Sequence, residues 1–139
     1  MKKLNERQNN KGFSLVELIV VIAIMVVLVA VLAPVFSKYI ESSRKSTDVQ
    51  NANSIAEAVL ADYADQKTIP TEKTEVKGDN TTVPTGVQGK DKLKVKGKEQ
   101  KDKSFYFQYN ADANTCAVFA GDDTNDLTTE AGAKAYKGD

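Results

Sequence analysis

A single carboxylate, Glu17, stands at the head of a long apolar stretch of the chain. The segment KGFSLVELIVVIAIMVVLVAVLAPVF covers residues 11–36, and the nineteen residues from Leu18 to Phe36 include no ionisable side chain. An ionised acid in hydrocarbon costs roughly 2.5 to 3.5 kcal/mol on insertion scales, so acids in such segments usually have a partner and a function. The sequence therefore raises the question of which cation pairs with Glu17.

Enzyme classes that depend on histidine or on paired cysteines are excluded by composition. The 139 residues include one cysteine, Cys116, and no histidine. A histidine general base, a Ser-His-Asp triad, a Cys/His zinc site and an intrachain disulfide are therefore ruled out. We find no catalytic constellation, and we expect no enzymatic activity, no metal site and no cofactor. Cys116 suits a small buried hydrophobe in a strand.

Two charged stretches have more than one interpretation. Lysines alternate at positions 90, 92, 94, 96 and 98, and this pattern suits either a solvated edge strand or a surface that binds DNA or another anion. No aromatic residue interleaves with them and acidic residues intervene, which favours the edge strand, so nucleic acid is not an expected partner. The segment GDDTND (121–126) offers carboxylates but lacks the EF-hand spacing, which favours a polar turn over a calcium loop.

The N-terminal segment has the features of both an export signal and an anchor. Residues 1–12 hold four basic side chains against one acidic, and the rest of the chain holds 15 basic and 18 acidic side chains. The 24 residues from Phe13 to Phe36 would span about 36 Å as a helix, enough to cross a hydrocarbon core of about 30 Å. The positive leader predicts a cytoplasmic N-terminus and an outward-facing C-terminal part.

A helical pattern continues beyond the apolar segment. From Lys38 the apolar residues recur at spacings of three and four, and neither Gly nor Pro occurs between Tyr39 and Lys67. Pro70 biases the preceding residue towards extended geometry, so we expect one helix over residues 13–66, ending near Gln66. Its second half should bury one stripe, made of Val49, Ala52, Ile55, Ala56, Val59, Leu60 and Tyr63.

The remaining part of the chain predicts a small antiparallel sheet. SFYFQY (104–109) and TCAVFA (115–120) are rich in aromatic and β-branched residues, and the five residues between them predict a hairpin. KLKVK (92–96) predicts a third strand, whereas residues 121–139 predict only a turn or short strand around Leu127 and an irregular tail. The expected fold class is α+β, with a long N-terminal helix packed against a small antiparallel sheet.

The basic leader followed by Gly12, Phe13 and Glu17 at the head of an apolar helix resembles the signal of type IV pilins and pseudopilins. The resemblance implies that prepilin peptidase cuts between Gly12 and Phe13 and then methylates the new amine of Phe13. It also implies that Glu17 of an incoming subunit pairs with the Phe13 amine of a neighbour in the filament. The alternative is an intrachain pair of Glu17 with Phe13 in an ordinary anchor.

A second position, Pro34, also matches the family. The resemblance implies that helicity is lost around this proline inside the filament, and a simple kink is the alternative. Many members have a glycine eight residues earlier, where this chain has Val26. The single cysteine cannot form the C-terminal disulfide of many pilins, and in this respect the chain resembles pilins of Gram-positive bacteria.

The resemblance implies a structural subunit of a type IV pilus that supports adhesion, motility or biofilm formation. Expected partners are further pilin subunits, prepilin peptidase and the pilus assembly platform, and the protein should move from the cytoplasmic membrane to a surface pilus. The expected organisation is a cleaved leader (1–12), a membrane and filament-core half-helix (13–38), an amphipathic half-helix (39–66) and a globular remainder (67–139). The alternatives are a pseudopilin of a secretion or DNA-uptake system and a membrane-anchored binding domain that does not polymerise.

Overall fold

The computed structural model describes residues 12–64 and 93–138, together with residues 70, 72–78, 83, 84, 86, 87 and 89. The chain divides into two compact units, the first ending at Ser37 and the second beginning at Lys38. One long helix, α1 (Leu15–Tyr63), contributes to both units.

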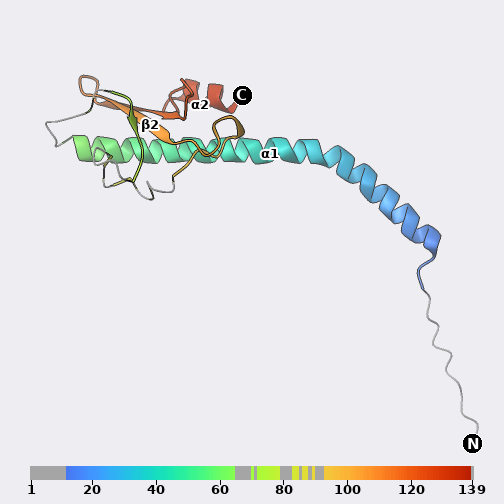
Figure 1. The fold of residues 1–139 in the computed structure, drawn as a ribbon. Helices are drawn as coiled ribbons and strands as arrows, with labels where there is room; N and C mark the ends of the chain where they lie inside the picture. Colours follow the sequence, from blue (N-terminus) through green and yellow to red (C-terminus); the bar gives the residue numbers. More distant parts are fainter. Residues whose placement is uncertain are drawn as a thin grey trace, which may run out of the picture. The chain divides into compact units, whose positions relative to one another are not determined.

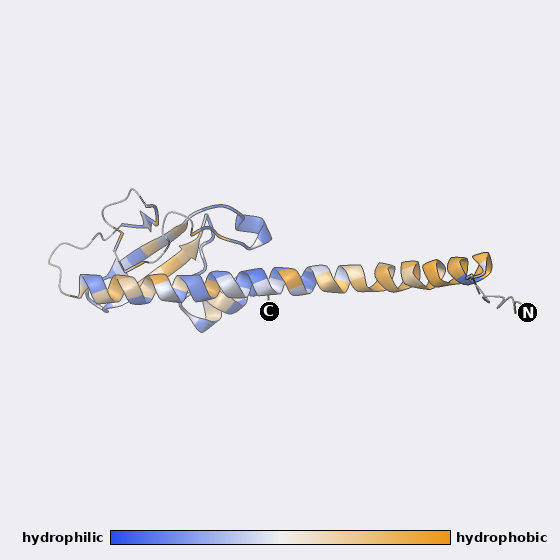
Figure 2. Cartoon of the chain, turned by 90° about the horizontal axis from the view of Figure 1, so that it is seen from below, coloured by the Kyte–Doolittle hydropathy of each residue, from blue (hydrophilic) through white to orange (hydrophobic). Residues whose placement is uncertain are grey.

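In the first unit, α1 is apolar on every side. Large hydrophobic side chains from Leu15 to Phe36 are exposed along this segment, and the N-terminal half of the helix is mostly orange in Figure 2. In the described part of the chain, α1 is long and apolar enough to cross a membrane. The helix predicted over 13–66 is confirmed over Leu15–Tyr63, and Gln66 lies outside the described residues.

The second unit contains a three-stranded antiparallel sheet, in which β2 is labelled in Figure 1. The order of the strands is β1-β2-β3. The strands are β1 (Thr74–Glu75), β2 (Phe105–Asn110) and β3 (Thr115–Ala120). β2 and β3 pair in register from Phe105 opposite Ala120 to Asn110 opposite Thr115. The predicted hairpin and the predicted α+β fold class are thereby confirmed.

The core of the second unit lies between the C-terminal half of α1 and one face of the sheet. Burial alternates along β2, where Phe105, Phe107 and Tyr109 are buried. Side chains that alternate in this way point to opposite faces of the sheet, so these three share the core face. On α1 the predicted stripe is confirmed: Ala52, Ile55, Ala56, Val59 and Tyr63 are buried, and Val49 and Leu60 pack against them.

The prediction of a strand over residues 92–96 is wrong for the described residues 93–96. Lys94 forms one isolated bridge with Ser104, and the third strand of the sheet is β1. Just beyond, the chain turns back through the short 3-10 helix η1 (Lys98–Gln100), and Val95 exchanges backbone hydrogen bonds of 3.0 Å with Asp102 and Lys103. Strand pairing cannot continue beyond Val95, because the backbone N–H groups of Lys96 and Gly97 donate to a side chain of α1.

That side chain is Asp48, a carboxylate with no exposed surface. Its Oδ1 accepts a hydrogen bond of 2.8 Å from Lys96 N, and its Oδ2 accepts bonds of 2.7 Å from Gly97 N and 2.9 Å from the Tyr136 hydroxyl. A side chain at Gly97 would have no room, since an added Cβ would lie 2.5 Å from the Tyr136 hydroxyl. Buried charges are stable when hydrogen bonds satisfy them, and Asp48 thereby joins three separate segments.

The predicted irregular tail is also wrong, because it contains the helix α2 (Glu130–Lys137). The Thr129 hydroxyl caps its start by accepting a hydrogen bond of 3.1 Å from Gly132 N. Gly138 ends the helix in the left-handed conformation, at φ 80°, which glycine adopts without strain. Leu127 lies in a turn ahead of this helix, as predicted, and is buried.

Candidate processing and assembly site

At the start of α1, the side chain of Glu17 contacts the backbone of Ser14. Ser14 N donates a hydrogen bond of 2.9 Å to Glu17 Oε2, and Leu18 N donates one of 3.2 Å to Ser14 O. This is half of a capping box, in which a Ser-x-x-Glu sequence satisfies donors that the first helical turn leaves unpaired. The positive end of the helix dipole also favours a carboxylate at this position. Glu17 therefore has a local structural role at the helix start.

Gly12 and Phe13 precede the helix and are both exposed. Phe13 is 92% exposed, and nothing lies within 4 Å of a Cβ placed on Gly12. The peptide bond between them is therefore outside the helical hydrogen-bond pattern and open to solvent. Beside it, an apolar hollow with one acid is lined by Phe13, Val16, Glu17, Leu18, Val20 and Val21.

Pro34 lies inside α1, far along the chain from Glu17. Seventeen residues separate the two positions, which corresponds to about 26 Å of helix. Proline has no backbone N–H, so the carbonyl of Ala30 lacks its usual helical donor. The next turn adds a side-chain bond, since Ser37 Oγ donates to Ala33 O at 3.0 Å. The structure therefore brings Gly12, Phe13 and Glu17 together and leaves Pro34 at a separate position.

Cys116 lies in β3 and is buried, as predicted. Burial, followed by the charge of Asp126, raises the pKa of its thiol to about 12. A thiol with such a pKa stays protonated at neutral pH and is a poor nucleophile. Cys116 is therefore a packing residue.

The two charged stretches are held by contacts within the second unit. In the lysine run, Lys94 Nζ donates to Ser104 Oγ at 2.9 Å, Lys96 and Lys98 are exposed, and positions 90 and 92 lie outside the described residues. In the stretch 121–126, Asp126 Oδ1 accepts hydrogen bonds from Val118 N and Thr128 N. These bonds make this stretch a hydrogen-bonded polar turn, as predicted.

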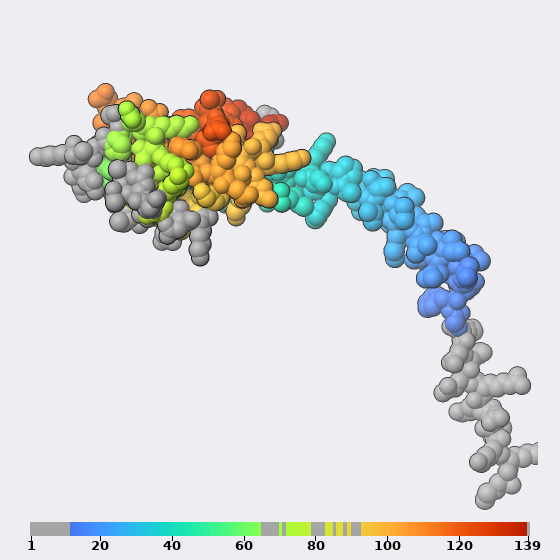
Figure 3. Space-filling model, viewed as in Figure 1, coloured from blue at the N-terminus to red at the C-terminus, as the bar shows by residue number. Residues whose placement is uncertain are grey.

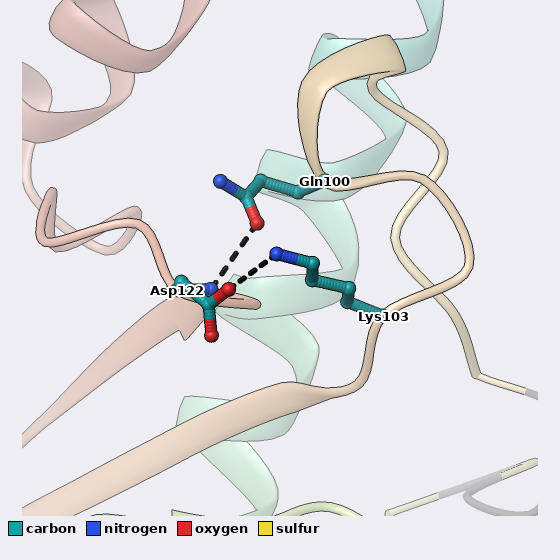
Figure 4. A network of polar contacts seen from close by, with 3 residues as sticks. All are labelled: Gln100, Lys103 and Asp122. Carbon is teal, nitrogen blue, oxygen red and sulfur yellow. Dashed lines mark hydrogen bonds and ion pairs between the residues drawn. The ribbon is translucent and has the colours of Figure 1, made fainter.

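Asp122 connects the same turn to η1 and to the segment after it. Its carboxylate is ion-paired with Lys103, and its backbone N donates a hydrogen bond of 3.2 Å to Gln100 Oε1 (Figure 4). The hydrogen bond from Lys103 lowers the pKa of the Asp122 carboxyl. Among the described residues, no group of three or more acidic or cysteine side chains could hold a metal ion.

Two residues of structural importance were not found from the sequence. Ser14 had a readable signal, since Ser-x-x-Glu before an apolar run is a helix-start pattern. Asp48 had none, because its hydrogen-bond partners lie 48 to 88 residues away in the chain. Such a distant set of donors becomes visible only in the folded structure.

The comparison with known proteins agrees with the geometry at the helix start. Residues 7–33 match the model of the prokaryotic N-terminal methylation motif. The chain is also 44% identical over 59 residues to the prepilin peptidase-dependent protein A of Clostridium perfringens (strain 13 / Type A). This match covers 41% of the chain and 42% of that relative, so the chain spans about two-fifths of the relative's length. No solved structure matches the chain. The N-terminal part of the chain therefore carries the signal of type IV pilin-like prepilins.

Proposed function

We propose that the protein is a structural subunit that polymerises into a type IV pilus. The observation that carries the proposal is the first unit, an apolar helix exposed on every side with one acid in its first turn. Exposed apolar surface of this extent must be covered by lipid or by other protein chains. Lipid covers it in the anchored subunit, and the helices of neighbouring subunits cover it in the filament.

The proposed processing step uses the exposed segment before the helix. Prepilin peptidase cleaves between Gly12 and Phe13 on the cytoplasmic side of the membrane and methylates the new Phe13 amine. Proteases act on extended backbone, so a bond outside the helix suits this step. The product carries a cation at the start of an apolar helix.

In the proposed assembly step, Glu17 receives the Phe13 amine of a neighbouring subunit. Within the described part of the chain, Glu17 makes one hydrogen bond, through Oε2 to Ser14 N. A carboxylate accepts several hydrogen bonds, so Oε1 remains available for the incoming amine. The hollow beside Glu17 offers apolar surface to the same neighbour. The pair fixes the depth at which a subunit enters, and the assembly platform at the membrane adds subunits in this register.

The proposed role of Pro34 is to permit local loss of helix in the filament. The missing donor at this position removes one helical hydrogen bond, so the turn around Pro34 is the weakest part of the apolar helix. In the extended pilus the protein serves adhesion, motility or biofilm formation at the cell surface.

The decisive experiment compares Glu17→Gln with Glu17→Ala. Glutamine keeps an oxygen for the Ser14 N–H and removes only the charge, whereas alanine removes the cap as well. Leaving a charge buried without its partner costs about 3 to 5 kcal/mol, so both variants should abolish surface filaments seen by electron microscopy. Mass spectrometry should still find mature protein that begins at methylated Phe13 in the membrane.

The matched control is Glu57→Gln, which removes an exposed carboxylate from the second unit and should leave filaments intact. Normal filament yield from both Glu17 variants would contradict the proposed pairing. Retention of residues 1–12 in the wild-type protein would contradict the processing step. Short filaments confined to the cell envelope would indicate a pseudopilin, and an anchored monomer would indicate a binding domain.

A further inference from the structure

The second unit carries a cluster of cations at the end that follows the apolar segment. Three come from the first turns of α1 in this unit and two from the loop that precedes and opens η1: Lys38, Arg44, Lys45, Lys96 and Lys98, here called the basic end. Lys45 is half-buried and the other four are exposed. Within the described part of the chain, none of the five takes part in an ion pair.

Two acids of α1 near the basic end, Glu41 and Asp48, accept hydrogen bonds from neutral donors and form no ion pair with its cations. Glu41 Oε1 accepts a hydrogen bond of 2.7 Å from Lys98 N. Asp48 is fully buried and accepts the bonds from Lys96 N, Gly97 N and the Tyr136 hydroxyl. These bonds place two loop lysines on the stretch of α1 that already carries three cations. Glu99 in η1 and Asp102 just after it are exposed acids of the same region.

The side chain of Lys45 lies over the ring of Tyr136. Its Nζ lies 5.5 Å from the centre of the Tyr136 ring, a cation–π distance. Figure 3 shows the segment after residue 93, drawn yellow to orange, lying directly against α1 in this unit. The basic end is therefore built by tertiary contacts and is not a property of one run of sequence.

An exposed aromatic residue, Tyr39, follows the apolar segment of α1. Tyr39, directly after Lys38, is 72% exposed although it is large and apolar in part. Tyrosine and tryptophan are enriched at the level of the lipid headgroups. Lys45 follows Tyr39 by six residues, or about 9 Å of helix, which is close to the Debye length of about 8 Å at physiological ionic strength. The basic end thus begins within electrostatic reach of the headgroups.

We propose that the basic end binds the phosphate groups of anionic phospholipids at the membrane surface while the protein is anchored. The proposal depends on membrane anchoring but not on polymerisation, so it goes beyond the proposed function. Lipid fits this surface better than nucleic acid because three of the cations lie on α1 in the turns that directly follow the apolar segment. Within the described residues of the basic end, no row of exposed aromatic rings offers a stacking platform for bases.

The test measures how fast a water-soluble reagent acylates each lysine of the full chain in nanodiscs. We expect acylation of Lys45, Lys96 and Lys98 to be about fivefold slower in phosphatidylglycerol discs than in phosphatidylcholine discs. Lys73 is the internal control, because it lies over the Tyr106 and Phe119 rings on the sheet and should react equally in both. At about 1 M salt, where the Debye length is about 3 Å, the difference should disappear.

Charge variants make the test specific to the basic end. Replacing Lys96→Gln and Lys98→Gln together keeps both backbone donors to α1, so the unit should stay folded while the protection of Lys45 falls. The matched variant Lys73→Gln should leave that protection unchanged. Equal acylation in the two kinds of disc, or protection that persists in high salt, would overturn the proposal. So would equal protection by duplex DNA added to phosphatidylcholine discs, which would make the surface a nucleic-acid site.

Discussion

Asp48 shows how one side chain can determine the course of a distant loop. It lies on α1 yet accepts hydrogen bonds from the loop at Lys96 and Gly97 and from Tyr136 on α2. Burial, together with the hydrogen bond to Asp48, raises the pKa of the Tyr136 hydroxyl. The hydroxyl therefore stays protonated and remains a donor to the carboxylate. Three segments of the second unit depend on this one acceptor.

Removing one donor from Asp48 should measurably destabilise the second unit. A hydrogen bond to a charged group contributes about 1.5 to 3 kcal/mol, so we expect Tyr136→Phe to lower the free energy of unfolding by about 2 kcal/mol. Asp48→Asn should cost more, because its amide nitrogen would face a donor. Urea unfolding followed by circular dichroism measures both changes. Tyr106→Phe on the outer sheet face is the control, and an equal loss from Tyr106→Phe and Tyr136→Phe would contradict this account.

At the scale of elements, regular patterns were predictable and tertiary loops were not. The long helix and the β2–β3 hairpin follow from apolar spacing over many residues, and Glu17 follows from its isolation in an apolar run. β1 has only two residues and therefore no pattern of its own. The segment 93–96 has the alternation of a strand, but Asp48 takes the backbone donors that a strand would use. Here a distant contact overrides local propensity.

The α2 helix was missed although its signals are local. Thr129 is a favourable N-cap, Glu130 lies in the first turn and Gly138 ends the helix. The sequence between them is short and contains Gly132, which lowers helix propensity. Burial of Tyr136 against Asp48 supplies the stability that propensity alone does not. Capping residues around a sequence of low helix propensity therefore predict a helix only when a residue such as Tyr136 also packs that helix against the core.

The N-cap of α2 offers a direct test of this balance. Thr129→Ala removes the acceptor for Gly132 N and should cost about 1 kcal/mol. We expect faster hydrogen exchange in the α2 amides, with little change in the amides of β2 and β3. Thr129→Ser keeps the acceptor and should restore the protection. Unchanged exchange in α2 after Thr129→Ala would show that docking through Tyr136 alone maintains the helix.

At the scale of the whole molecule, the two units bury their apolar residues in different ways. The second unit has its own core, which includes the fully buried side chains Ile55, Phe105, Phe107 and Leu127. The first unit leaves its apolar side chains exposed, and in the proposed function they are covered by lipid or by other subunits. The residues that fold the second unit are therefore different from those that the proposed assembly uses.

A shortened chain that begins at Lys38 should be soluble, folded and monomeric. Of the described large apolar residues that are exposed, only Tyr39 and Ile40 lie in this part, and this area is far smaller than a stable interface needs. Glu41 and Asp48 remain, so the contacts to residues 96–98 and to α2 are kept. Sedimentation should give the mass of a monomer, and circular dichroism should show one cooperative unfolding transition. Replacing Tyr39→Ser and Ile40→Ser together controls for association through the two apolar residues that remain exposed near the new N-terminus. Dimers that persist in this double variant would place an assembly interface in the second unit, and filament formation would then depend on more than the apolar helix.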